Sequence, residues 1–304
     1  MDLQPLFDAP IVEQRYVDRD YSGYGNDVWF VRTATEHVIV RVSARSGAGG
    51  AFWTGLKRLF GIDAMDMDRL RTVSNFVNDA RGLRAPSVLR TGVFEGRSYA
   101  ITELAPGRHV DSFDHVPAAA AEAFGVAVAQ AHQRTFGQCG CPGGTVTYPA
   151  AQFHERVAGA IDWLAKEYRE ADERDRAVAR DCARMLREMP PARTASLVLI
   201  DIGGSQYLWD DNGPTAVVDT EAFVFAPKEL ELIVLESDNG YAFNEAFRRG
   251  YETVSPLPRL RLARAPYRCL IALLEVNGRM SLDDALSAPV WLDDANLPTS
   301  SGRP

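Results

Sequence analysis

A Pro-Gly turn at Pro106 and Gly107 separates two stretches of chain with different residue patterns. Before the turn, short segments rich in β-branched and aromatic residues are divided by glycines, which is typical of a sheet. After it, long Ala-rich amphipathic segments are typical of helices. We therefore predict an α+β fold of two lobes, with a β-rich lobe over residues 1–104, a mainly helical lobe over residues 105–304 and a hinge at the turn.

The pattern also predicts individual elements. In the first lobe we expect three strands and one helix, at Val28 to Arg32, Val38 to Val42, Ser98 to Glu103 and Asp66 to Arg81. In the second lobe we expect helices at Val116 to Arg134, Ala150 to Arg169, Asp172 to Glu188, from Pro227 onward, at Gly240 to Glu252 and at Pro266 to Val276. Two short apolar runs, Leu197 to Ile200 and Ala216 to Val218, flank the turn cluster Trp209 to Pro214 and predict a β-hairpin within the helical lobe.

Composition and charge exclude several classes of protein. The chain of 304 residues has a formal net charge of -8, which argues against a nucleic-acid backbone as its main partner. Its apolar runs are much shorter than the roughly 20 residues that cross a bilayer, so we expect no membrane insertion. The N-terminus lacks a basic start and an apolar h-region, so a cytoplasmic location is predicted. The four cysteines lack zinc-site spacing and are interpreted as loop and core thiols, with metal binding by Cys139 and Cys141 as the alternative.

Three oxygen-bearing side chains mark the predicted hairpin. Asp201 follows its first strand, Gln206 lies in the connecting loop, and Asp219 follows its second strand. Carboxylate and amide oxygens, together with phosphate oxygens, are how kinases hold Mg²⁺. We therefore predict that Asp201 orients or deprotonates an acceptor hydroxyl while Gln206 and Asp219 hold the metal. The alternative is that these acidic residues only cap neighbouring backbone.

Two features upstream favour phosphate binding. The segment that contains Ser22, Gly23, Gly25 and Asn26 has small residues whose backbone N–H groups can approach a phosphate. Arg41 lies in an apolar strand, where a cation needs an anionic partner, and a phosphate would supply one. The alternative for Arg41 is the solvated face of an edge strand.

Three motifs of the chain resemble those of the aminoglycoside phosphotransferase family. Leu199 to Gln206 occupies the place of the family's H-G-D-x-x-x-x-N loop, and Val217 to Glu221 occupies that of its I-D-W/F-E segment. Phe124 to His132 resembles the L-G-x-x-L-A-x-L-H helix that precedes the loop. The resemblance extends from about residue 21 to about residue 282.

This resemblance implies a protein-kinase-like bilobal fold. It also implies transfer of the γ-phosphoryl group of ATP or GTP to a hydroxyl of a small acceptor, for which an amino sugar is one candidate. It implies Asp201 as the catalytic base, Mg²⁺ as the metal, and adenine against the backbone from Glu103 to Ala105. Acceptor candidates in the helical lobe are Asp162, Glu167, Tyr168 and Glu275, although a helix-surface role is favoured for each.

Several positions depart from the family pattern. Leu199 replaces the His that braces the catalytic loop, Gln206 replaces the metal-binding Asn, and Arg41 replaces a strand Lys. The Glu that pairs with this cation from the helix of the first lobe has no clear match, with Asp66 and Asp68 as the nearest acidic candidates. A second hypothesis is therefore a catalytically degenerate kinase fold that binds nucleotide or another small ligand without turnover.

The remaining candidate residues receive structural interpretations. We expect His109, His115 and His132 to have core or surface roles, and Glu231 to lie on a solvated helix face, with bracing of the catalytic loop as its alternative. The apolar residues between Phe52 and Phe60 are interpreted as packing, with a flap over the nucleotide as the alternative. A third hypothesis, a scaffold protein, predicts that these residues form an exposed apolar patch.

Overall fold

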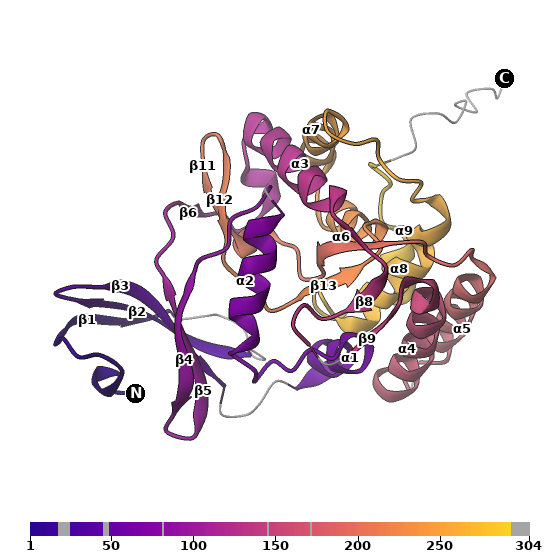
Figure 1. The fold of residues 1–304 in the computed structure, drawn as a ribbon. Coiled ribbons are helices and arrows are strands. Elements are labelled where there is room, and N and C mark those ends of the chain that lie inside the picture. The colour runs from indigo at the N-terminus through magenta and orange to yellow at the C-terminus, as the bar shows by residue number, and fades with distance from the viewer. Residues whose placement is uncertain (18–24, 45–48, 81, 145, 171, 293–304) are drawn as a thin grey trace.

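The computed structural model describes residues 1–17, 25–44, 49–80, 82–144, 146–170 and 172–292. It confirms the α+β fold, with a β-rich part on one side and a mainly helical part on the other (Figure 1). The β-rich part is a five-stranded antiparallel sheet of order β1-β2-β3-β5-β4. Its strands are β1 (Ile11–Tyr16), β2 (Asn26–Thr33), β3 (His37–Ser43), β4 (Val88–Phe94) and β5 (Arg97–Glu103).

Strand β3 lies at the middle of this sheet, between β2 and β5. Val38, Val40 and Val42 alternate along it and are buried in a cluster with side chains of β2 and β5. Arg41 is on the opposite face, which is the face turned toward the helical part. The helix α2 (Arg69–Asp79) covers the sheet beside β4.

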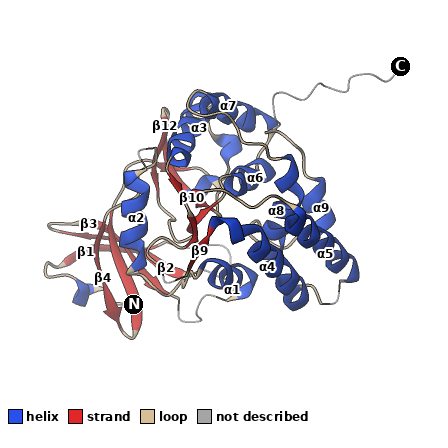
Figure 2. Cartoon of the chain, turned by 45° about the vertical axis from the view of Figure 1, so that its right-hand side comes forward, coloured by secondary structure: helices blue, strands red, loops and turns tan. Residues whose placement is uncertain are grey.

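The second part contains seven helices among the described residues, and Figure 2 shows them gathered on one side of two small sheets. These are α3 (Ala118–Gln133), α4 (Phe153–Tyr168), α5 (Glu173–Glu188), α6 (Glu229–Asp238), α7 (Tyr241–Glu252), α8 (Arg261–Leu274) and α9 (Leu282–Ser287). The predicted helix start at Pro266 is wrong, because α8 begins at Arg261 and includes this proline.

The predicted hairpin is wrong in its pairing. One sheet has the order β7-β10-β13-β8-β9 and the other has the order β12-β11-β6. Thus β10 (Ala195–Leu199) pairs with β13 (Phe223–Ala226), whereas β12 (Gly213–Val217) pairs with β11 (Tyr207–Asp210). The short strands β6 (Arg108–His109), β7 (Thr135–Phe136), β8 (Gln138–Gly140) and β9 (Thr147–Pro149) complete the sheets. The turn cluster closes the nearer pair of strands, which leaves the fully buried β10 to pair within the core.

The helix α1 (Gly50–Phe60) links the two parts of the molecule. It precedes residue 104 in sequence but contacts α4 and α8 of the helical part. Leu56, Leu59 and Phe60 are 0–3% exposed and belong to the large helical core. The packing interpretation of this apolar segment is therefore confirmed, and the exposed patch expected for a scaffold protein is contradicted. The boundary after residue 104 stays a prediction about domains.

Two glycines allow the close crossing of α3 and α7. A Cβ on Gly250 would lie 1.8 Å from the backbone oxygen of Glu122, and one on Gly125 would lie 2.1 Å from that of Phe247.

We expect Gly250→Ala to lower the free energy of unfolding by about 1–3 kcal/mol, because the helices must separate. The matched control is Gly159→Ala on the exposed face of α4, where a Cβ meets nothing within 4 Å. Ala is the better helix former, so this control should be stabilising by about 0.5–1 kcal/mol. Urea denaturation measures both, and equal effects would contradict the crossing argument.

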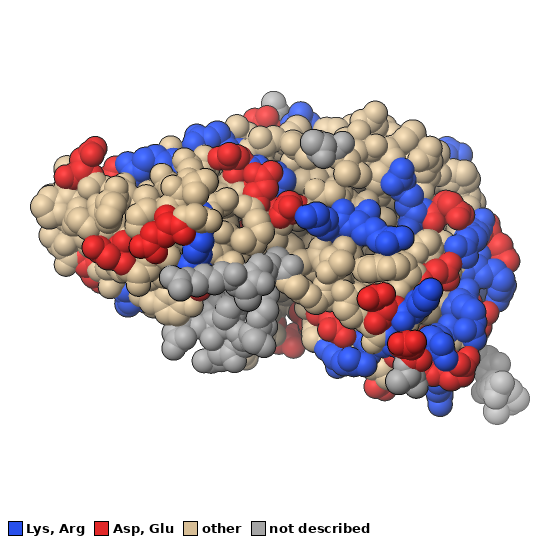
Figure 3. All heavy atoms as spheres, turned by 90° about the horizontal axis from the view of Figure 1, so that it is seen from below, with Lys and Arg blue, Asp and Glu red and all other residues tan. Residues whose placement is uncertain are grey.

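The surface of the helical part carries both signs of charge. Figure 3 shows Lys and Arg side chains interspersed with Asp and Glu on the face viewed from below. Along α5, Arg176 pairs with Glu173 and Arg184 pairs with Asp181. None of the helices in the described ranges is both long and apolar enough to cross a bilayer.

Candidate active site

The loop between β10 and β11 brings together the three side chains that the sequence singled out. Asp201 follows the buried strand β10, and Gln206 ends a short 3-10 turn that leads into β11. The backbone N–H of Val218 donates to the carbonyl of Gln206 at 2.8 Å, which ties the residue before Asp219 to this loop. Asp201, Gln206 and Asp219 therefore converge even though the predicted hairpin does not form.

The carboxyl group of Asp201 is electrostatically perturbed. Burial, followed by the negative charges of Glu221 and Asp238, raises its pKa to about 6, and a hydrogen bond from Gln206 opposes this shift. A carboxyl with a raised pKa is a better proton acceptor when ionised than an ordinary aspartate. Asp201 is thus suited to receive a proton from a hydroxyl at neutral pH.

Asp219 and Glu221 form a pair of neighbouring carboxyl groups. Burial and the neighbouring Glu221 raise the pKa of Asp219 well above its ordinary value. Burial also acts to raise the pKa of Glu221, but Arg41 and the hydrogen bond with Asp219 outweigh it and bring the value to about 2. Negative charge is therefore more costly on Asp219 than on Glu221, because Arg41 contacts Glu221 directly and lies farther from Asp219.

Arg41 is buried against this pair. Its side chain is 9% exposed, and its guanidinium contacts Glu221, lies 3.5 Å from Asp219 and donates to the carbonyl of Val218. The edge-strand alternative is therefore wrong, because β3 is an inner strand and Arg41 points into the protein. The acidic candidates Asp66 and Asp68 are not its partners, because its ion pairs are with Asp219 and Glu221. Asp66 accepts from the backbone N–H of Arg69 at 3.3 Å.

The predicted phosphate-binding segment is described in part. Ser22 and Gly23 lie outside the described residues. Gly25 precedes β2, and its carbonyl accepts from Ala44 at 2.9 Å. Asn26 begins β2, is 7% exposed, and donates from its side chain to Glu221 at 2.8 Å. The described end of this segment therefore lies beside the carboxyl pair.

A small apolar cluster lies beside the hinge. Ala105 packs with Leu208 and Ala216 of the β11–β12 hairpin, with Val218 against them. Glu103, at the end of β5, forms an ion pair with Arg84 at 2.6 Å. Leu208 and Val218 were missed by sequence reasoning, although each adjoins a singled-out residue: Leu208 lies two residues after Gln206, and Val218 directly precedes Asp219.

The loop that carries Asp201 is braced by the buried side chains of Glu231 and His132. Glu231 is 3% exposed and accepts from the backbone N–H of Leu199 at 2.9 Å. Its second oxygen lies 2.6 Å from Nε2 of His132, whose Nδ1 lies 3.1 Å from the hydroxyl of Tyr251. The solvated-face interpretation of Glu231 is wrong, and its bracing alternative is confirmed. His132 occupies a core position, as expected, while His109 and His115 are exposed.

The two cysteines considered for metal binding are buried in the helical core. Cys139 and Cys141 are buried free thiols, and burial raises the pKa of Cys139 to about 12. Arg69 donates to the sulfur of Cys141 at 3.2 Å. Among the described residues, no three His, Cys, Asp or Glu side chains are placed to hold a metal ion by themselves. A cation at the carboxyl pair would need further oxygens, as Mg²⁺ obtains from phosphates.

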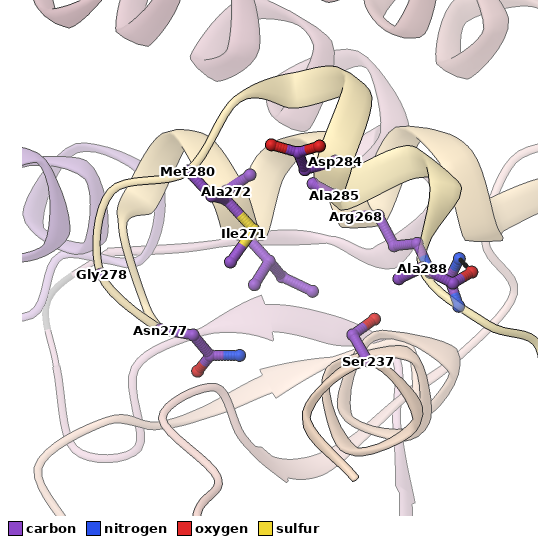
Figure 4. Close-up of a pocket in the computed structure, with 10 residues that line it drawn as sticks. All are labelled: Ser237, Arg268, Ile271, Ala272, Asn277, Gly278, Met280, Asp284, Ala285 and Ala288. Carbon is purple, nitrogen blue, oxygen red and sulfur yellow. Dashed lines mark hydrogen bonds between the residues drawn. The ribbon is translucent and has the colours of Figure 1, made fainter. Parts of the chain in front are cut away.

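The helical part also contains a cavity of about 230 Å³ between the end of α6, α8 and the α9 region. Figure 4 shows Ser237 and Asn277 beneath Ile271 and Met280. Glu231 and Asp238 lie on one face of α6, whereas Ser237 is rotated by about 100°, so the cavity is on another side of this helix than the catalytic loop. The predicted acceptor candidates lie elsewhere: Asp162 pairs with Arg187 at 2.7 Å and Glu275 lies 3.7 Å from Arg169.

A β-rich part joined to a helical part, with two aspartates near a buried cation, is the arrangement of kinase-like phosphotransferases. The chain belongs to the phosphotransferase enzyme family, whose pattern matches residues 19–263. This confirms the resemblance seen in the sequence and shows that the protein is a phosphotransferase.

Solved structures show the same fold. A protein from Haemophilus somnus 129PT, provisionally assigned as a fructosamine-3-kinase, is 17% identical with a TM-score of 0.61, covering 92% of this chain and 90% of its own. An aminoglycoside phosphotransferase APH(4)-Ia mutant, solved with AMP-PNP and hygromycin B, is 20% identical with a TM-score of 0.60, covering 93% and 92%. The macrolide 2'-phosphotransferase MphH from Brachybacterium faecium is 15% identical with a TM-score of 0.58, covering 95% and 97%. No curated protein sequence matches the chain.

Proposed function

We propose that this protein transfers the γ-phosphoryl group of ATP or GTP to a hydroxyl of a small-molecule acceptor. The observation that carries the proposal is the convergence of Asp201, Gln206 and Asp219 at one end of the loop that the Val218 to Gln206 hydrogen bond closes. Phosphoryl transfer depends on positioning and electrostatic stabilisation, and this arrangement supplies both a proton acceptor and oxygen donors.

Gln206 and Asp219 are proposed to hold Mg²⁺. The residues fit a hard cation because the donors are oxygens and because burial and the neighbouring Glu221, which raise the pKa of Asp219, disfavour a negative charge that a cation would stabilise. When bound, Mg²⁺ neutralises phosphate charge and orients the phosphates. Asp201 accepts the proton of the acceptor hydroxyl, and the hydrogen bond from Gln206 keeps its carboxylate in position.

The nucleotide is proposed to bind between the lobes. Adenine or guanine would stack against Ala105, Leu208 and Val218 and meet the backbone from Glu103 to Ala105, because this apolar cluster adjoins the hinge. The phosphates would lie under the segment that contains Ser22, Gly23, Gly25 and Asn26, and near Arg41. Since the Asn26 side chain already bonds Glu221, its contribution to phosphate would come from its backbone.

The acceptor is proposed to approach Asp201 past the junction of α6 and α7. Asp238, at the end of α6, lies close enough to raise the pKa of Asp201. Asp114 accepts from the backbone N–H of Gly240 at 3.1 Å and adds negative charge at the same junction. This charge favours a cationic acceptor such as an amino sugar. Macrolides and fructosamines should also be tested as acceptors, because the names of two similar structures refer to these compounds.

Binding and turnover are tested in sequence. Thermal-shift titration should show stabilisation by Mg-ATP, Mg-GTP or both, because a ligand that binds only the folded state raises the unfolding temperature. A phosphate-transfer assay over amino sugars, macrolides, fructosamines and small alcohols should then find an acceptor. Stabilisation without transfer to any of them, or hydrolysis, would favour the degenerate-kinase hypothesis. No response to either nucleotide would contradict both hypotheses.

A further inference from the structure

Glu221 gathers contacts from three elements of the β-rich lobe, although it belongs to the segment after Asp219 in the helical lobe. One carboxylate oxygen accepts from Asn26 of β2 at 2.8 Å and from Arg41 of β3. Its backbone carbonyl accepts from Arg69, at the start of α2, at 2.5 Å. Glu221 is 4% exposed, and Asn26, Arg41 and Arg69 are each less than 9% exposed. The four residues thus form one buried connection between the lobes.

Among the charged residues near Arg41, Glu221 is the one placed to orient its guanidinium. Asp66 and Asp68, the acidic residues just before α2, are exposed and do not pair with it. Glu36 and Asp27, which are nearer in sequence, pair with Arg90 and Arg97. The first residue of α2 is itself a cation, Arg69, so the helix beside the sheet contributes positive charge at this point. Asp219 lies farther from Arg41, at 3.5 Å, than the directly bonded Glu221.

We infer that Glu221 is a positioning residue that holds the Arg41 guanidinium toward the nucleotide phosphates and ties β2, β3 and α2 to the metal-binding segment. The inference rests on the proposed function. A planar guanidinium has five N–H donors, so Arg41 can remain bonded to Glu221 and Val218 while other donors turn to a phosphate. A Lys at position 41 would have a single ammonium group to share among the same partners. This explains why an Arg can serve in this strand.

The first test uses the ligand-free protein. A double-mutant cycle compares Arg41→Gln, Glu221→Gln and the double variant by thermal unfolding. We expect the double variant to lose less stability than the sum of the two single losses, because each single change leaves the other group buried with an incomplete set of partners. Additive losses would overturn the pairing. Asp68→Asn, an exposed acidic residue at the start of α2, is the matched control and should leave stability and nucleotide affinity unchanged.

The second test measures nucleotide affinity by calorimetry with Mg-ATP and Mg-GTP at saturating Mg²⁺. Glu221→Gln should weaken nucleotide binding by about 10-fold to 100-fold, the effect of losing one charge-assisted hydrogen bond. Arg41→Gln should weaken it as much, and the double variant should be no weaker than either. In a transfer assay the KM for nucleotide should rise while the KM for the acceptor stays unchanged, a split that a general loss of folding would not produce.

The outcomes separate this inference from the proposed function. Wild-type protein that binds neither nucleotide would overturn both, even if the ligand-free cycle showed the pairing. Wild-type binding that Glu221→Gln leaves unchanged would overturn the positioning role alone. A higher Mg²⁺ requirement for Glu221→Gln at unchanged nucleotide affinity would make Glu221 a metal ligand and would also overturn the positioning role.

Discussion

Asp201→Asn should abolish most phosphoryl transfer and at the same time make the protein more stable at neutral pH. We expect turnover to fall by about 10²-fold to 10⁴-fold, because the amide cannot accept the proton of the acceptor hydroxyl. The gain in stability has a separate cause: burial, with Glu221 and Asp238 nearby, raises the pKa of this carboxyl from 3.8 to about 6. Ionising it in the folded protein is therefore costly, and the variant avoids that cost.

The pH dependence of this gain has a definite sign. A carboxyl whose folded pKa is raised binds its proton more tightly in the folded state, so it stabilises the protein at low pH and that stability is lost as pH rises from about 4 to about 6. Asp201→Asn should thus exceed wild type by on the order of 1–3 kcal/mol at pH 7.5 and match it near pH 4. Differential scanning calorimetry at the two pH values measures this.

Asp211→Asn provides the control for both readouts, because its side chain is 86% exposed on the turn of the β11–β12 hairpin. It should change neither turnover nor the pH dependence of stability. Transfer at the wild-type rate in Asp201→Asn would show that another group accepts the proton. An unchanged unfolding temperature at pH 7.5 would show instead that the Asp201 carboxylate is well solvated.

Glu231→Ala should destabilise the protein by about 3–5 kcal/mol and slow turnover as well. The change leaves the backbone N–H of Leu199 and the ring of His132 buried without the carboxylate that they contact at 2.9 Å and 2.6 Å. Because Leu199 lies two residues before Asp201, loss of this brace should also loosen the catalytic loop. Urea denaturation and the transfer assay measure the two effects.

Glu231→Gln is the matched variant for this prediction. Its amide carbonyl can accept from Leu199 and its NH₂ group can donate to His132 Nε2, so both hydrogen bonds survive in a neutral form. We expect a cost of about 1 kcal/mol and turnover near that of wild type. If Ala and Gln at this position were equally stable and active, the brace would have no part in holding the loop.

Local features of the sequence were enough to predict much of the fold. The period of apolar residues indicated the helices from α2 to α7 and the strands β2, β3 and β5, since burial of one face depends on spacing along a single element. The Pro-Gly turn marked the change from sheet to helix because its signal, too, depends only on neighbouring residues. Strand pairing was harder: β10 and β12 were assigned to one hairpin, although each has a different neighbour. A pattern of apolar residues shows that a strand is buried but does not name its partner.

The sequence by itself showed the resemblance to phosphotransferases and singled out Asp201, Gln206 and Asp219, because these residues lie within one short stretch of chain. Tertiary structure alone decided the partners of the buried charges. Arg41 meets Glu221 across 180 positions of sequence, and His132 meets Glu231 across 99. A buried charge must find its counter-charge in space, and which residue stands there depends on how the two lobes pack.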